Sequence, residues 1–124
     1  MRIVIVEDEV ALADILRDEF REKGFEADIA SDGEAAIPLI QKVKPDIVLL
    51  DLLLPKKDGF AVLQELKADP NLLGTRVIVL SNLGQDEELK RALSLGAIDY
   101  FVKAQHPLKE VVEKVCHHAI APAV

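Results

Sequence analysis

The chain has 124 residues, of which 50% are hydrophobic and 30% are charged. This balance supplies one packed core and excludes a disordered or fibrous chain, and the length fits a single domain. With 22 acidic and 15 basic residues the formal net charge is −7, and the chain has no basic cluster of the kind that direct nucleic-acid binding needs.

Cysteine usage and the lengths of the apolar runs favour a cytoplasmic setting away from membranes. The single cysteine, Cys116, has no partner for an internal disulfide, and no basic, apolar leader opens the chain at Met1. Apolar runs such as Ile3–Val6 and Ile47–Leu50 are far shorter than the roughly 20 residues of a membrane-spanning helix. We therefore expect no membrane association.

Five short segments rich in Val, Ile and Leu are predicted to be strands. In chain order they are residues 3–6, 25–30, 47–50, 77–80 and 98–102. The first, third and fourth are continuously apolar, which is typical of parallel strands covered on both faces. Residues 25–30 alternate apolar and polar side chains, so we expect an edge strand with one solvated face.

Segments with helical spacing lie between the predicted strands. One apolar stripe consists of Leu12, Ile15, Leu16 and Phe20, and another consists of Leu108, Val111, Val112, Val115 and Cys116. Ser31 and Glu34 predict a capping box at the start of the second helix, and Asp58 is expected to cap the third.

The alternation of five strands with five helices predicts an α/β fold. All crossovers are long enough for right-handed parallel connections, so we expect a doubly wound three-layer sandwich around a five-stranded parallel sheet. The strand order 2-1-3-4-5 is taken from flavodoxin-like domains of this kind. The prediction is one domain at residues 1–119 and a tail, or the start of a linker, at residues 120–124.

A polar residue follows the first, third, fourth and fifth predicted strands. Glu7 and Asp8 follow the first apolar run, Asp51 the third, Ser81 the fourth and Lys103 the fifth. In a doubly wound sheet, ligands bind beyond the carboxyl ends of the strands, where the strand order reverses. Because strands one and three are neighbours in the expected order, we expect the three carboxylates to share one pocket.

The expected pocket requires positive charge. Carboxylates about 4 Å apart repel by up to about 4 kcal/mol per pair at an effective dielectric constant near 20. Lys103 supplies one charge, and a hard divalent cation supplies two; Mg²⁺ prefers carboxylate and water ligands. A carboxylate beside Mg²⁺ can attack phosphorus, so Asp51, the central acid, is the expected nucleophile, and the Ser81 hydroxyl could donate to a phosphoryl oxygen.

These residues resemble the receiver domain of two-component response regulators, of the chemotaxis-regulator-like kind, over residues 2–118. The matching segments are residues 6–9, 50–51, 54–59, 80–81 and 96–103. Each segment alone is a weak signal, but five in this order along the chain form a strong one.

The resemblance implies a phosphoprotein of phosphorelay signal transduction. Asp51 would take a phosphoryl group from the phosphohistidine of a sensor histidine kinase or phosphotransfer protein, while Ser81 and Lys103 would hold the phosphoryl oxygens. The domain would catalyse only its own phosphorylation and dephosphorylation, and would not otherwise be an enzyme.

The resemblance also implies a set of Mg²⁺ ligands. Asp8 and Asp51 would bind the metal directly, Glu7 would act through water, and Leu53 would contribute its backbone carbonyl.

The switch is likewise implied by the resemblance. Tyr100 matches the aromatic residue whose rotamer follows the hydroxyl residue, so Ser81 and Tyr100 are the expected switch residues. Helix four, strand five and helix five would then bind a downstream effector or a second copy of the chain.

The sequence departs from the family pattern at three positions. Ala104 stands where a proline in a cis bond usually follows the lysine, Asn82 stands where a small residue is commoner, and Leu53 replaces a polar residue seen in some members. These departures leave open a phosphorylation-independent adaptor of the same fold. In a phosphorylated domain, Asn82 and Leu53 favour a long-lived phosphoryl group.

Two other functional classes share parts of the pattern. Dehalogenase-like phosphatases use a strand-end aspartate with Mg²⁺, but they need a second aspartate two residues later as general acid, where this chain has Leu53. A flavodoxin-type flavin site needs backbone donors in its first loop, where Glu7, Asp8 and Glu9 would repel a phosphate. The sequence disfavours both classes.

The histidines and the cysteine are expected to have no role in the chemistry. His106, His117 and His118 have no carboxylate or cysteine at metal-ligand spacing and are expected on the surface. Cys116 belongs to an apolar stripe and is expected to be a small core residue.

Overall fold

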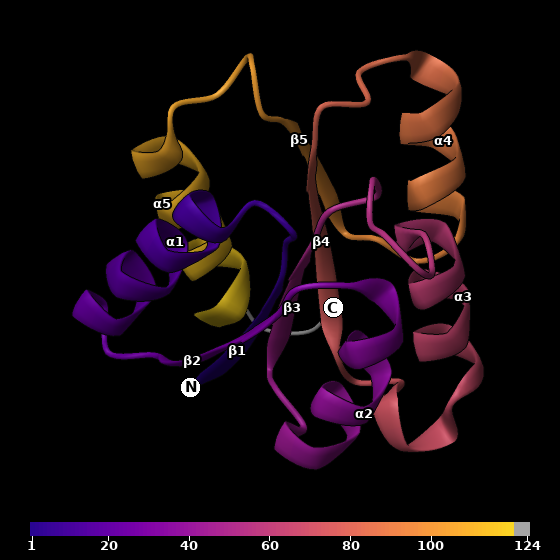
Figure 1. Ribbon diagram of the computed structural model, residues 1–124, viewed down its shortest axis with the longest axis horizontal. Helices are drawn as coiled ribbons and strands as arrows, with labels where there is room; N and C mark the ends of the chain where they lie inside the picture. Colours follow the sequence, from indigo (N-terminus) through magenta and orange to yellow (C-terminus); the bar gives the residue numbers. More distant parts are fainter. Residues whose placement is uncertain (121–124) are drawn as a thin grey trace.

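The computed structural model describes residues 1–120 as five strands that alternate with five α-helices (Figure 1). The strands are β1 (Arg2–Val6), β2 (Glu26–Ala30), β3 (Ile47–Leu50), β4 (Arg76–Ser81) and β5 (Asp99–Val102). The helices are α1 (Val10–Glu22), α2 (Gly33–Val43), α3 (Gly59–Ala68), α4 (Asp86–Ser94) and α5 (Leu108–Ile120), and a short 3₁₀ helix, η1 (Pro70–Leu72), precedes β4. The predicted α/β alternation is confirmed.

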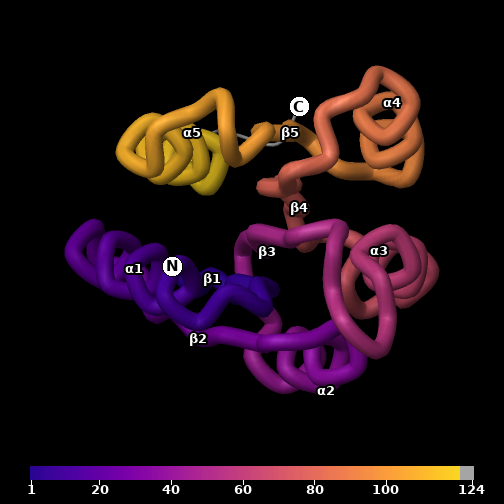
Figure 2. The backbone as a smooth tube through the Cα atoms, turned by 45° about the horizontal axis from the view of Figure 1, so that its top comes forward, coloured from indigo at the N-terminus to yellow at the C-terminus, as the bar shows by residue number. Residues whose placement is uncertain are grey.

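The strands form one parallel sheet with the order β2-β1-β3-β4-β5. Helices α1 and α5 cover one face of this sheet, and α2, α3 and α4 cover the other (Figures 1 and 2). The three layers and the strand order are those predicted, so the doubly wound, flavodoxin-like sandwich is confirmed.

Each central strand divides its side chains between two buried layers. Because successive residues of a strand point to opposite faces, Ile3 and Ile5 of β1 pack with α1 and α5, whereas Val4 and Val6 pack on the side of α2, α3 and α4. The side chains of β3 and β4 are divided in the same way. Burial on both faces explains why these strands are continuous apolar runs in the sequence.

The edge strand β2 starts one residue later than predicted. Its burial alternates only in part: Ala27 is buried between the exposed Glu26 and Asp28, but Ala30 at the end of the strand is also buried, on the opposite face. Phe25 precedes the strand and packs edge-on against Phe20, with ring centroids 5.6 Å apart. The aromatic pair packs in the core beside α1, and the pairing of β2 with β1 begins at the next residue.

The predicted capping box of α2 is wrong by one residue. The N-cap is Asp32, whose carboxylate accepts a hydrogen bond from the amide of Ala35 at 2.7 Å, and not Ser31. The cap of α3 is confirmed, because Asp58 accepts from the amide of Ala61 at 3.0 Å. Both aspartates place an acceptor on otherwise unpaired amides at a helix start.

No helix within residues 1–120 combines the length and the apolar character needed to cross a membrane. Helix α5 extends to Ile120, so the first residue of the expected tail is helical. Residues 121–124 of that expected tail lie outside the described part of the chain.

Candidate functional site

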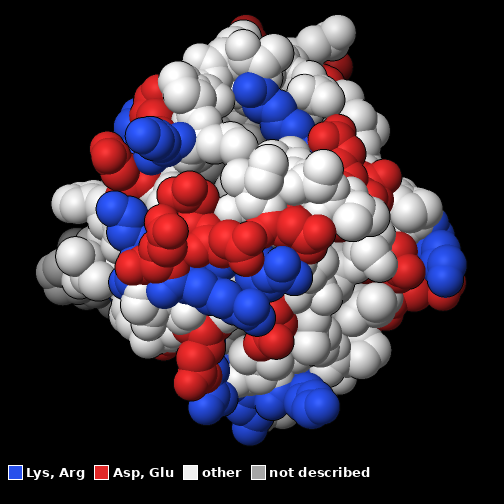
Figure 3. Space-filling view, turned by 60° about the vertical axis from the view of Figure 1, so that its left-hand side comes forward, with Lys and Arg blue, Asp and Glu red and all other residues white. Residues whose placement is uncertain are grey.

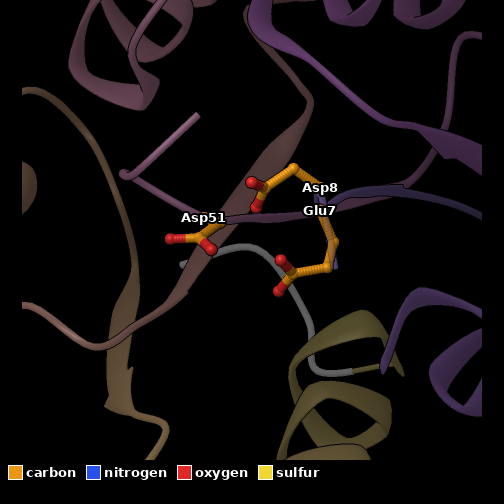
Figure 4. Close-up of side chains that lie close together, drawn as sticks. All are labelled: Glu7, Asp8 and Asp51. Atoms are coloured by element: carbon orange, nitrogen blue, oxygen red, sulfur yellow. The ribbon is translucent and has the colours of Figure 1, made fainter. Parts of the chain in front are cut away.

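Three carboxylates meet at the carboxyl edge of the sheet. The pairing of Val6 with Leu50 aligns the ends of β1 and β3, and the residues that follow them are Glu7, Asp8 and Asp51. One carboxylate oxygen of each acid lies within 4.8 Å of the other two (Figure 4). The predicted convergence is therefore present in the structure.

The backbone around Asp51 holds its carboxylate in place. The amide of Asp51 donates to the carbonyl of Val6 at 3.0 Å, which continues the ladder between β3 and β1 by one residue. The amide of Leu53 donates to Asp51 Oδ1 at 3.0 Å, whereas the side chain of Leu53 is 52% exposed. With Asp51 itself only 4% exposed, its carboxylate is fixed in a largely buried position.

Lys103 brings positive charge to the same place. Its Nζ lies 2.7 Å from Glu7 Oε1 and 2.8 Å from Asp51 Oδ2, and its side chain is 12% exposed. A longer contact of 3.6 Å joins it to Glu9 Oε1. The lysine predicted to hold phosphoryl oxygens thus lies between two of the carboxylates and compensates their charge.

Burial and charge shift the titration of this cluster. Burial raises the pKa of Glu7 to about 7; the charge of Asp51 acts in the same direction, and the hydrogen bond from Lys103 opposes it. Burial alone would lower the pKa of Lys103, but its hydrogen bonds to Asp51 and Glu7 outweigh burial and raise the pKa above its usual value. Lys103 therefore stays an ammonium at neutral pH.

The donor set fits a hard divalent cation. All three convergent groups are carboxylates, two of them buried, and their oxygens lie close enough together to share one ion. Oxygen ligands of this kind suit Mg²⁺, Mn²⁺ and Ca²⁺, and a single ammonium leaves the cluster with excess negative charge. The acidic cluster could therefore bind a metal ion, while the ligand role of the Leu53 carbonyl stays a prediction.

Ser81 and Tyr100 are linked through the backbone of Leu83. Ser81 ends β4 with its side chain fully buried, and its Oγ accepts from the amide of Leu83 at 3.4 Å. Tyr100 lies on β5 with its ring buried, and its hydroxyl donates to the carbonyl of Leu83. Burial raises the pKa of Tyr100 to about 12, with the charges of Glu88 and Asp51 acting in the same direction, so the hydroxyl remains a donor.

Leu83 is the residue that the sequence did not reveal. Its contribution is a backbone amide and a backbone carbonyl, which every residue but proline offers. Only the turn after β4 places both groups within reach of Ser81 and Tyr100.

Gly59 allows the segment after Asp51 to fold back against the start of α3. Its amide donates to the carbonyl of Leu52 at 2.9 Å. A Cβ atom at this position would lie 2.3 Å from the carbonyl oxygen of Asp51 and 2.5 Å from the Cα of Leu52. Only glycine lets the two backbones approach this closely.

The sequence model of the response regulator receiver domain matches residues 3–115. The chain belongs to this family. Receiver domains are signalling modules of two-component systems, so the recognition made from the five motifs is confirmed, and the phosphoacceptor signalling role predicted with it agrees with the family.

In amino-acid sequence, this receiver domain is similar to parts of larger regulators among the curated proteins. It is 37% identical to a probable transcriptional regulator, ycf27, of Guillardia theta, over 92% of this chain and 43% of that protein. It is 35% identical to the DNA-binding response regulator MtrA of Mycobacterium tuberculosis, over 92% of this chain and 48% of that protein. The chain thus spans less than half the length of either relative.

Solved structures share the fold of this receiver domain over nearly its whole length. The BeF3-activated N-terminal receiver domain of Klebsiella pneumoniae RstA superposes with a TM-score of 0.88 at 26% identity, covering 98% of this chain and 100% of that one. The Mn(2+)-bound form of the response regulator Rcp1 gives a TM-score of 0.85 at 28% identity, covering 99% and 96%.

Proposed function

We propose that this receiver domain accepts a phosphoryl group on Asp51 from the phosphohistidine of a sensor histidine kinase or phosphotransfer protein, with Mg²⁺ as cofactor. The observation that carries the proposal is the convergence of Glu7, Asp8 and Asp51 within 4.8 Å beside the ammonium of Lys103. Glu7, Asp8, Asp51 and the carbonyl of Leu53 would hold the metal, which when bound would neutralise charge on the transferring group.

The chain's own residues divide the remaining work of phosphoryl transfer. A carboxylate oxygen of Asp51 forms the new P–O bond while the P–N bond to the donor imidazole breaks, and the imidazole keeps the bonding electrons and takes up a proton. The resulting acyl phosphate no longer carries the Asp51 carboxylate charge, so Lys103 exchanges that partner for a phosphoryl oxygen. The hydroxyl of Ser81 donates to another phosphoryl oxygen.

The same exchange provides a switch between two packings. When the hydroxyl of Ser81 turns toward the phosphoryl group, its contact with the Leu83 amide at 3.4 Å weakens. Leu83 also accepts from Tyr100, so the change is transmitted to the aromatic ring on β5. Phosphorylation shifts the population toward the packing in which the Ser81 hydroxyl contacts the phosphoryl group and Leu83 and Tyr100 have adjusted to that change.

Two structural neighbours support the proposal through what they contain. The RstA receiver domain was solved in a BeF3-activated form, and Rcp1 was solved with bound Mn²⁺. Mn²⁺ and Mg²⁺ both favour carboxylate and water oxygens, so the acidic cluster of this chain suits the same class of ion.

The partners and setting follow from the same role. We infer that the surface of α4, β5 and α5 binds a downstream effector or a second copy of the chain, and that the domain acts in the cytoplasm without binding nucleic acid itself. The net charge of −7 supports the last point, as do the acidic side chains that border the basic ones on the side of α1 and α5 (Figure 3).

A phosphorylation assay tests the proposal. The protein is incubated with Mg²⁺ and a small acyl-phosphate donor, and its intact mass is measured. We expect a mass gain of one phosphoryl group, which is lost in Asp51→Asn and after chelation of Mg²⁺. Asp28→Asn, at an exposed position on the edge strand β2, is the matched control and retains the gain. An unmodified wild type would contradict the proposal and favour the phosphorylation-independent adaptor.

A further inference from the structure

The segment that joins β5 to α5, residues 103–107, carries Lys103 at its start. Two backbone hydrogen bonds fix this start: the Lys103 amide donates to the Ser81 carbonyl and the Gln105 amide to the Val102 carbonyl, both at 2.9 Å. The next residue after the lysine is Ala104 and not proline. No proline ring therefore restricts the backbone at this position, and the ring of Pro107 restricts it only at the end of the segment.

His106 supplies an anchor at the far end of the segment. Its ring packs edge-on against Phe101 of β5, with centroids 5.2 Å apart and planes at 79°. Its Nδ1 lies 3.2 Å from Oε1 of Glu110, in the first turn of α5. The sequence predicted a surface histidine without a role, but this side chain is half-buried and contacts both elements that the segment joins.

A cavity of about 310 Å³ lies beside the same segment. From the segment it is lined by Lys103, Ala104 and His106, and the residues opposite include Glu9 and Leu12. The ammonium of Lys103 lies between Glu7 and Asp51 although open space is available next to it. The contacts with Glu7 and Asp51 hold the ammonium, while the backbone of the segment sets the point from which the side chain reaches them.

We propose that His106 is the positioning residue for Lys103: through Phe101 and Glu110 it holds the segment so that the ammonium lies between Glu7 and Asp51. The inference rests on the proposed function for its consequence, because the charge positioned in this way is the one that would meet the phosphoryl group. The position of the Lys103 ammonium does not depend on phosphorylation, so the role of His106 can be tested on the unphosphorylated protein.

Replacement of His106 should leave the domain folded. Lys114 also contacts both partners of the histidine, with its Nζ 3.3 Å from Oε1 of Glu110 and 5.6 Å from the centroid of Phe101. Each partner thus keeps one cationic neighbour in His106→Ala. The denaturation midpoint of every variant is measured to establish this.

The test measures how fast an amine-acylating reagent modifies Lys103, followed by peptide mass spectrometry in chelator and without a phosphodonor. In the wild type the Lys103 side chain is 12% exposed and its ammonium is paired with two carboxylates, so modification is slow. Loss of an aromatic contact and a charge-assisted hydrogen bond should make Lys103 react about three- to tenfold faster in His106→Ala. His106→Phe, which keeps the ring, should restore part of the slow rate.

His117→Ala is the matched control, because His117 is exposed in the last turn of α5, at the opposite end of that helix from this segment. It should leave the modification of Lys103 at the wild-type rate. A folded His106→Ala protein whose Lys103 reacts at the wild-type rate would overturn the proposal, as would equal acceleration in the two alanine variants.

Phosphoryl uptake from the acyl-phosphate donor separates the two proposals. If the wild type gains a phosphoryl group, we expect His106→Ala to gain it more slowly, with the rate partly recovered in His106→Phe. If the wild type gains none, the proposed function fails, and the acylation rates still decide the role of His106.

Discussion

Glu7 is the acid whose titration the fold changes most clearly. Its pKa rises from 4.5 to about 7 in the folded protein, because burial disfavours its charged form. Between these values the folded state keeps a proton that the unfolded state has released. As far as Glu7 contributes, the free energy of unfolding of the metal-free protein therefore falls as the pH rises through this window.

Glu7→Gln tests this dependence, because the amide does not titrate. We expect the free energy of unfolding of the wild type, taken relative to that of Glu7→Gln, to decrease as the pH is raised from 4.5 to 7. Urea titrations in chelator at several pH values measure the difference. A difference that stays constant with pH would show that Glu7 titrates normally in the folded state.

Leu53 is expected to slow the loss of the phosphoryl group. Its exposed apolar side chain stands two residues after Asp51 and offers no hydrogen bond to an attacking water. In Leu53→Asn one added hydrogen bond should speed dephosphorylation by roughly tenfold, about 1.4 kcal/mol of transition-state stabilisation. The decay of the phosphorylated mass after donor removal measures this rate. Leu73→Asn, an exposed leucine in the turn after η1, should decay at the wild-type rate.

The β3–α3 connection holds Asp51 through the close approach of backbone atoms. In Gly59→Ala the new Cβ would lie 2.3 Å from the Asp51 carbonyl oxygen, a backbone atom that cannot rotate away. We expect a loss of about 1–3 kcal/mol in the free energy of unfolding. Slower phosphoryl uptake should accompany it, because the loop that carries the acceptor must shift.

Gly74→Ala is the control for this element. No heavy atom lies within 4 Å of a Cβ built at Gly74, so the free energy of unfolding should change little. Urea titration and phosphoryl uptake are measured for both variants. An equal effect at the two glycines would show that the close approach at Gly59 is not what constrains the acceptor loop.

At the scale of the whole molecule, cation binding should stabilise the fold. The three carboxylates come from the ends of two neighbouring strands, β1 and β3, so an ion held between them binds the folded chain and not the unfolded one. At a free Mg²⁺ concentration of 100 times Kd the expected gain is about 2.7 kcal/mol. Thermal melts across a Mg²⁺ titration measure it.

Asp8→Asn removes one of the three convergent carboxylates and should weaken this stabilisation. Asp28→Asn, at an exposed position on the edge strand β2, should keep the full rise in Tm. If Mg²⁺ raised the Tm of Asp8→Asn as much as that of the wild type, the ion would be binding elsewhere on the acidic surface.

Local patterns in the sequence predicted the strands and the layers, whereas the strand order was taken from flavodoxin-like domains. Continuous apolar runs predicted strands buried on both faces, and the alternation in residues 25–30 predicted the edge strand. Because a parallel sheet brings its strand ends to one edge, the residues after those runs already contained the three acids that converge. These features depend on side-chain type and spacing, which can be taken directly from the amino-acid sequence.

Only the tertiary structure decided how the site is held together. The link from Tyr100 to the backbone of Leu83 and the pairing of Lys103 with Glu7 join groups whose geometry no local pattern encodes. A backbone carbonyl has no side-chain signature, and an ion pair between residues far apart in the sequence forms only after the sheet has aligned their strands. The sequence therefore determined which chemical groups reach the edge, and packing determined which of them touch.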